Sequence, residues 1–137
     1  MTHKQFTDKY QNRYLDYDGS YGNQCTDLMR AYVKEVYKHS PYIAIPTRGN
    51  AKDIYRKFAT NIYFRKVANT PNNVPSQGDI IFWGTYPFVT GFAGHVGIVD
   101  SANVKNFVVF NQNYPTNNPC NFRKFDYRGI MGWLSKN

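Results

Sequence analysis

The sequence predicts an α+β fold in which N-terminal helices pack on a central antiparallel β-sheet. In the first half of the chain, apolar residues recur every three or four positions, as on one face of a helix. In the second half, short runs of branched and aromatic residues are separated by turns, as in a meander of strands. The hydrophobic content of 42% within 137 residues is enough for one core, so we expect a single domain over residues 1–137.

The helices are placed by their apolar spacing and their end signals. Residues 3–12 predict a short polar helix, and a longer one is expected from about residue 25 to residue 38. Prolines and a glycine predict a loop over residues 40–50. Asn50, at the end of this loop, is the expected N-cap of a third helix over residues 51–59.

The strands follow a proline-rich turn. Residues 80–83 predict a short buried strand, and residues 95–99 and 107–113 predict the next two. Closing strands are expected over residues 122–127 and 130–134. No apolar run reaches the length of about eighteen residues that a membrane span needs, so we expect none.

The chain is strongly basic, with seventeen Lys and Arg against nine Asp and Glu and a net charge of +8. Such a surface attracts polyanions, whether nucleic acid, an anionic membrane or the phosphate polymers of a Gram-positive wall, and charge alone does not choose among them. The N-terminus lacks the apolar segment of a secretory signal. We therefore expect synthesis in the cytoplasm and, for any action outside it, release by another route.

Acidic residues are crowded into residues 16–27, on either side of Cys25. Oxygen-bearing side chains or turn carbonyls recur there at a spacing close to that of an EF-hand loop, although the glycine and the last carboxylate depart from that motif. The positions are Asp16, Asp18, Ser20, Gly22 and Asp27. The spacing predicts one bound calcium ion, and the alternative is a solvated Asx-turn loop in which Asp27 caps a helix.

Cys25 is a candidate nucleophile because it falls in the first turn of a predicted helix. There the unpaired backbone N–H groups and the helix dipole favour a thiolate. The neighbouring aspartates oppose it, and a bound cation would remove that opposition. The structural alternative is a small buried hydrophobic residue. The second cysteine, Cys120, forms no metal-binding spacing with it, and we assign it no role.

A thiolate mechanism needs a base and a group that orients the base. His95 begins a predicted strand between small residues, which leaves room for a substrate. Asn111 and Asn113 alternate along another predicted strand, so one could hold the imidazole while the other polarises a carbonyl. The alternatives are a structural histidine and an asparagine-rich turn.

Four segments together resemble the CHAP domain, the cysteine- and histidine-dependent amidohydrolase/peptidase module of phage endolysins and bacterial wall hydrolases. They are Asp-x-Asp-Gly-x-x-Gly-x-Gln-Cys-x-Asp-Leu at 16–28, Pro-x-x-Gly-Asp-Ile-Ile-x-Trp at 75–83, Gly-His-Val-Gly-Ile-Val at 94–99 and Val-Val-Phe-Asn-Gln-Asn-Tyr at 108–114. The resemblance covers nearly the whole chain and implies a papain-like fold.

The resemblance also implies roles for individual residues. Cys25 would be the nucleophile and His95 the general base and acid. Asn111 stands where many members have Glu as the orienting residue, and Asn113 where they have Asn. The Gln24 side chain would help the Cys25 N–H to stabilise the oxyanion. Calcium would be held by three aspartates and by main-chain carbonyls near two further residues, namely Asp16, Asp18 and Asp27 with Ser20 and Gly22.

The implied function is a peptidoglycan hydrolase of the phage endolysin or virion-associated type. It would cut one amide bond of the wall, as an endopeptidase or as an N-acetylmuramoyl-L-alanine amidase. Its partners would be Gram-positive peptidoglycan and anionic wall polymers rather than nucleic acid, and it would act as a monomer on the wall after release or when carried on a virion. The competing hypothesis is a non-catalytic polyanion-binding module built on a hydrolase fold.

Overall fold

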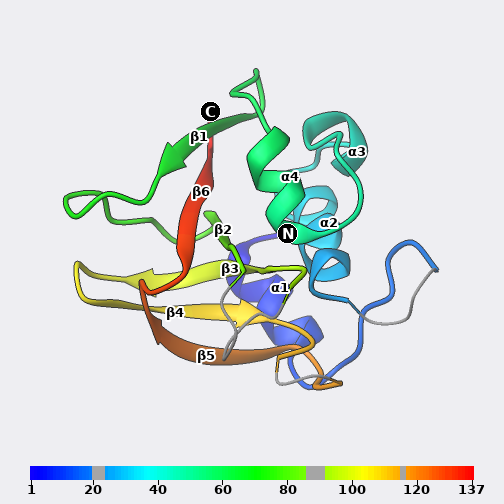
Figure 1. Cartoon of the computed structure of the whole chain (residues 1–137). Coiled ribbons are helices and arrows are strands. Elements are labelled where there is room, and N and C mark those ends of the chain that lie inside the picture. The colour runs from blue at the N-terminus through cyan, green and yellow to red at the C-terminus, as the bar shows by residue number, and fades with distance from the viewer. Residues whose placement is uncertain (20–23, 86–91, 115–116) are drawn as a thin grey trace.

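The structure is a computed structural model that describes residues 1–19, 24–85, 92–114 and 117–137, and within these residues it contains four helices and one six-stranded sheet. The helices are α1 (His3–Tyr10), α2 (Cys25–Glu35), α3 (Pro41–Ala44) and α4 (Ala51–Lys57). The strands are β1 (Phe64–Ala68), β2 (Ile80–Trp83), β3 (His95–Ala102), β4 (Asn106–Asn111), β5 (Asn121–Asp126) and β6 (Ile130–Lys136). The sheet has the order β1-β6-β2-β3-β4-β5, and every neighbouring pair is antiparallel (Figure 1).

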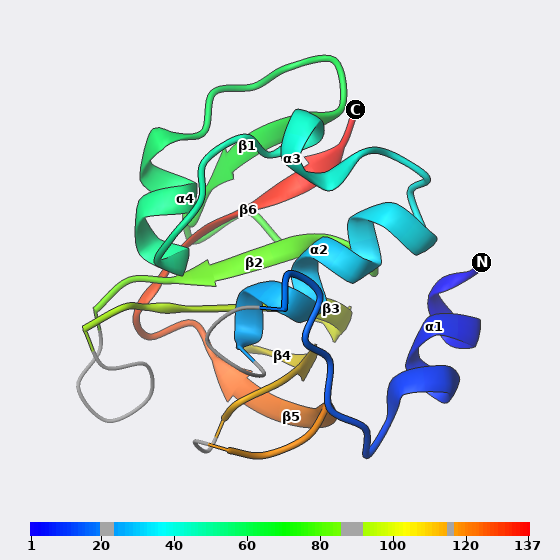
Figure 2. The same cartoon turned by 90° about the vertical axis from the view of Figure 1, so that its right-hand side faces the viewer.

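The strands bury alternate residues on opposite faces of the sheet. On β2, Ile80 and Phe82 pack in the core that the helices cover, whereas Ile81 and Trp83 pack in a second core. Figure 2 shows α2, α3 and α4 in front of the sheet, with α1 to one side of them. The predicted α+β fold with helices packed on an antiparallel sheet is therefore confirmed. None of the described helices is both long and apolar enough to cross a membrane.

Several element boundaries differ from the sequence-based expectations. The cysteine helix ends at Glu35, because Lys38 adopts a left-handed φ of 60° and the chain turns away. The predicted loop after it contains the single-turn helix α3, which Pro41 begins at the position where a missing N–H costs nothing. The edge strand β1 was not predicted, because it has only two strongly apolar residues. It forms a strand through its antiparallel pairing with β6.

The third predicted strand is shorter than expected at its C-terminal end. Strand β4 ends at Asn111, and Asn113 already has a left-handed φ of 66°. The regular alternation that would place both asparagine side chains on one face therefore stops before Asn113.

Candidate active site and acidic cluster

The first turn of α2 carries the candidate nucleophile. Gln24 is the N-cap, Cys25 is the first helical residue, and the Asp27 carboxylate accepts a hydrogen bond from the Gln24 N–H at 2.8 Å. The other oxygen of Asp27 accepts from the Tyr17 N–H at 3.1 Å. The buried Asp27 carboxylate therefore fixes both the start of the helix and the loop that precedes it.

Cys25 is partly buried, and its thiol is not activated by its position alone. Burial raises the pKa of the Cys25 thiol to about 11, while the N–H groups of Val96, Thr26 and Cys25 itself lower it in part and the charge of Asp27 raises it further. Desolvation therefore outweighs the lowering of the Cys25 pKa that we expected from the helix N-terminus. Val96 follows His95 in the chain, so the thiol lies against the start of β3.

His95 is the first residue of β3, and α2 packs on this strand. The imidazole is buried, with the rings of Trp83 and Tyr114 at centroid distances of 5.1 and 5.9 Å. Burial lowers the pKa of His95 to about 4, and its hydrogen bond with Asn111 raises it only in part. At neutral pH the ring is therefore uncharged and able to accept a proton.

Asn111 determines which ring nitrogen of His95 accepts that proton. Its Oδ1 atom lies 2.8 Å from Nε2 of His95, and its Nδ2 atom donates to Asn121, at 3.2 Å to the carbonyl oxygen and 3.3 Å to Oδ1. These acceptors orient the amide so that its oxygen faces the ring. Since an amide oxygen only accepts, Nε2 carries the hydrogen and Nδ1 keeps its lone pair.

Asn113 has a different environment. Its Oδ1 atom accepts from the Asn117 N–H at 2.7 Å, and its own N–H donates to the Asn118 carbonyl at 3.0 Å. These bonds, together with the left-handed φ, place Asn113 in the turn that leaves β4. Asn111 is therefore hydrogen-bonded to His95, whereas Asn113 lies in a turn.

Gln112, for which the sequence predicts no role, connects the two sides of the site. Its side chain is buried and bonded to two segments: Nε2 donates to the carbonyls of Leu15 and Gln24, both at 2.8 Å, and Oε1 accepts from the Leu15 N–H at 2.6 Å. The end of β4 is thereby tied to the residue before Cys25. A polar residue between two other polar ones gave no signal in the sequence that its side chain would be buried.

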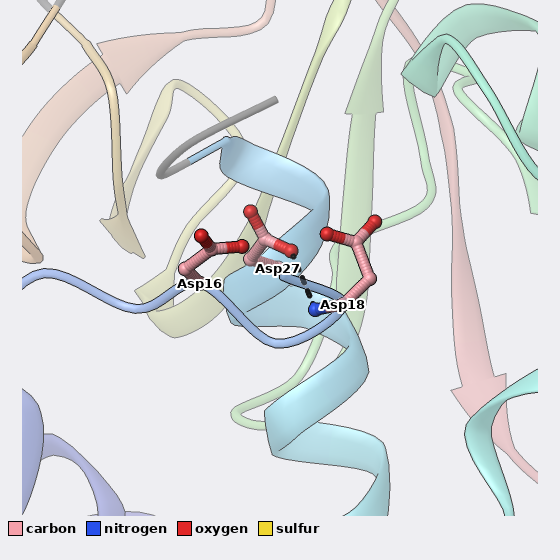
Figure 3. Close-up of side chains that lie close together, drawn as sticks. All are labelled: Asp16, Asp18 and Asp27. Carbon is pink, nitrogen blue, oxygen red and sulfur yellow. Dashed lines mark hydrogen bonds between the residues drawn. The ribbon is translucent and has the colours of Figure 1, made fainter. Parts of the chain in front are cut away.

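Three predicted calcium ligands converge beside α2. One carboxylate oxygen from each of Asp16, Asp18 and Asp27 lies within 4.8 Å of the others (Figure 3). Burial and the charges of the other two aspartates raise the pKa of Asp27 to about 6. Three hard oxygen donors that oppose one another's ionisation suit a divalent cation such as calcium. The other two predicted ligands, Ser20 and Gly22, lie outside the described residues.

The cysteine that begins α2, the histidine that begins β3 and the amide bonded to that histidine are the residue types of the Cys-His-Asn site in papain-like proteases. The family model of the CHAP domain matches residues 14–113, and the chain belongs to this family. It is 32% identical to the endolysin PlyTW of Staphylococcus phage Twort over 92% of its length, and 34% identical to the endolysin LysK of Staphylococcus phage K over 73%.

The fold is also similar to a solved structure. The crystal structure of the wild-type endolysin LysIME-EF1 superposes with a TM-score of 0.76 and 20% identity, over 98% of this chain and 64% of that one. The matches to PlyTW and LysK cover only 27% and 19% of those endolysins. The chain therefore corresponds to one part of each of these larger proteins.

Proposed function

We propose that this chain is a catalytic unit of a peptidoglycan hydrolase of the phage endolysin type, which cleaves an amide bond of the bacterial wall. The observation that carries the proposal is the hydrogen bond between Nε2 of His95 and Oδ1 of Asn111, because it leaves Nδ1 to act as the base. His95 begins β3, the strand against which the Cys25 thiol lies. The likeness to two staphylococcal phage endolysins supports the wall as the substrate. Either an endopeptidase or an amidase would use the same chemistry.

The raised thiol pKa and the lowered imidazole pKa favour a neutral resting pair over a preformed ion pair. Nδ1 of His95 would take the thiol proton as the sulfur of Cys25 attacks the amide carbonyl carbon. The Cys25 N–H and the Gln24 side chain would bind the oxyanion, each such donor contributing about 3 kcal/mol. His95 then protonates the leaving amine as the C–N bond breaks. A water deprotonated by His95 hydrolyses the thioester and restores the thiol.

Calcium is part of this proposal, with Asp16, Asp18 and Asp27 as its side-chain ligands. When bound, the ion would supply positive charge that neutralises the carboxylates and fixes the loop before Cys25. The chain's own contribution is the Asp27 carboxylate, which already holds the Gln24 and Tyr17 N–H groups. We also propose that the net charge of +8 holds the enzyme on anionic wall polymers, so that added salt weakens lysis.

The test is the clearing of purified Gram-positive walls by the wild type and by Cys25→Ser, each with calcium and with chelator. We expect only the calcium-loaded wild type to clear the walls, and mass spectrometry of the fragments then identifies the bond. Sedimentation with the walls is the second measurement, and Cys25→Ser should still bind them. If the wild type binds walls from several hosts without cleaving them, the polyanion-binding alternative replaces this proposal.

A further inference from the structure

A pocket of about 490 Å³ lies beside the first turn of α2, and the mechanism above does not use the basic end of its lining. Gln24 and Thr26, the two neighbours of Cys25 in the chain, belong to its lining. The lining is completed by Asp18, Asp27, Arg30, Tyr42, Arg48, Gly49 and Asn50. Because the lining includes Gln24, whose side chain is a proposed oxyanion donor, a substrate bound at that donor would extend into this pocket.

Two arginines and a tyrosine form the basic end of the pocket. The guanidinium carbon of Arg48 lies 3.9 Å from the ring centroid of Tyr42, and that of Arg30 lies 4.4 Å from the same centroid. The acidic residues of the lining, Asp18 and Asp27, instead direct their carboxylates toward Asp16 in the cluster of Figure 3. The pocket thus has separate acidic and basic ends.

The two arginines have different roles at the basic end. Arg30 is buried and donates to the carbonyls of Pro41, Ile45 and Thr47 at 3.0, 2.5 and 2.6 Å. These bonds fasten the segment from α3 to Thr47 onto α2. Arg30 is therefore a structural anchor for the segment that carries Arg48, and most of its donor capacity is already used.

Arg48 is exposed, and within the described parts of the chain no carboxylate pairs with it. Stacking on Tyr42 restricts the guanidinium to one plane while its N–H edges remain available. Burial and, to a lesser extent, the charge of Arg48 lower the pKa of Arg30 to about 10. An anion bound at this end would relieve the repulsion between the two cations.

We propose that Arg48 is a specificity-determining residue that binds a free carboxylate of the wall peptide whose amide bond is cut. A planar guanidinium matches a carboxylate with two parallel hydrogen bonds. The stem peptides of peptidoglycan carry carboxylates, whereas its neutral sugars cannot make this pair. The inference rests on the proposed function for the identity of the ligand, and it assigns the pocket to the peptide part of the substrate.

The probes are a synthetic stem tetrapeptide with free carboxylates and the same tetrapeptide with its carboxylates amidated. Their binding to Cys25→Ala, which cannot turn them over, is measured by calorimetry at low salt. We expect the free carboxylate form to bind about five- to tenfold more tightly, the range for a charge-assisted pair that remains partly open to solvent. Adding Arg48→Gln should remove this preference, and Arg48→Lys should keep only part of it, because the ammonium lacks the flat fork.

Arg56→Gln is the matched control, since it removes one exposed arginine on α4 and changes the net charge equally. It should leave the preference for the carboxylate intact. On whole walls, Arg48→Gln should raise the half-saturating wall concentration with little change in the maximal rate, as expected for a group that binds substrate and transition state alike.

The outcomes separate this inference from the proposed function. Equal binding of the two peptides, or no measurable binding of either, overturns the role of Arg48 even if the wild type clears walls. A carboxylate preference that Arg48→Gln abolishes supports the role, even if wall hydrolysis fails. An equal loss of affinity in Arg48→Gln and Arg56→Gln would reduce the effect to net charge and also overturn the inference.

Discussion

Cys25 and His95 each begin a secondary-structure element, but different forces hold the two residues in place. On the histidine side, His95, Asn111 and Asn121 lie on adjacent strands whose ladders fix their register. On the cysteine side, the loop before α2 is held by Asp27, whose carboxylate also belongs to a cluster of three mutually repelling acids. The sheet therefore preorganises His95, the proposed base, whereas the segment before Cys25, the proposed nucleophile, depends on how the acidic charge is balanced.

Removal of calcium should have the largest effect and should act on one side only. We expect chelation to abolish wall clearing, because the uncompensated aspartates loosen the loop before Cys25 and oppose loss of the thiol proton. The NMR signals of the His95 ring should change little, while the backbone amides near Asp16 and Asp27 shift.

Calcium should restore both activity and spectra, and magnesium should not, because it demands a smaller octahedral site. Full activity in a sample shown to be free of metal would remove calcium from the mechanism. A large change at His95 on chelation would contradict the independence of the two sides.

The second-largest effect is expected from a substitution on the histidine side. Asn111→Ala should lower kcat about 100-fold, because the ring loses the acceptor that keeps the hydrogen on Nε2. Calcium affinity should be unchanged, as measured by calorimetry. Asn106→Ala, at the other end of the same strand, is the control and should retain nearly full activity. Unchanged kcat in Asn111→Ala would show that the ring needs no such partner.

Asn111→Asp sharpens the same test through pH. A carboxylate against the ring favours imidazolium, so the low pKa of His95, about 4 in the wild type, should rise. Because the base acts only when neutral, the acidic limb of kcat/KM should move to higher pH. An unmoved acidic limb in Asn111→Asp would assign that limb to another group.

The low pKa of His95 also affects the stability of the wild type. The wild type should lose stability as the pH falls from about 6.5 toward this pKa, since the unfolded chain takes up the proton first.

Several elements of the fold and the position of Cys25 were predicted from the sequence, because local sequence signals specify them. The strand over residues 80–83 is a continuous apolar run between turns, and it forms at those residues. The start of α2 at Cys25 followed from the polar loop and the apolar spacing after it. In both places the local preference and the tertiary environment favour the same structure.

The remaining features depend on contacts between distant segments. Strand β1 carries two adjacent basic residues, and its pairing with β6 provides the evidence for a strand. The thiol pKa was predicted from the helix N-terminus, but burial against β3 dominates it. The turn at Asn113 depends on hydrogen bonds with Asn117 and Asn118, which a strict alternation along the strand does not anticipate.

Gln112 offers a way to weaken the connection between the two sides. Gln112→Leu keeps a similar volume but leaves the Leu15 N–H and the carbonyls of Leu15 and Gln24 without partners. We expect the free energy of unfolding, measured in urea, to fall by about 2–4 kcal/mol. Gln77→Leu, which removes one exposed hydrogen bond, should cost less than about 1 kcal/mol. Equal losses in the two variants would mean that Gln112 does not join the sides.

The smallest effect is expected at Asn113, which tests whether the histidine side includes one asparagine or two. Asn113→Ala should lower stability by about 1 kcal/mol, because its left-handed backbone and its bond to the Asn117 N–H disfavour alanine. Asn113→Gly should recover part of this loss, since glycine adopts positive φ freely. Both variants should keep kcat within about twofold of the wild type, because the Asn111 amide alone orients His95. A tenfold fall in kcat in Asn113→Gly, with the His95 ring signals unchanged, would instead place the Asn113 amide against the substrate carbonyl.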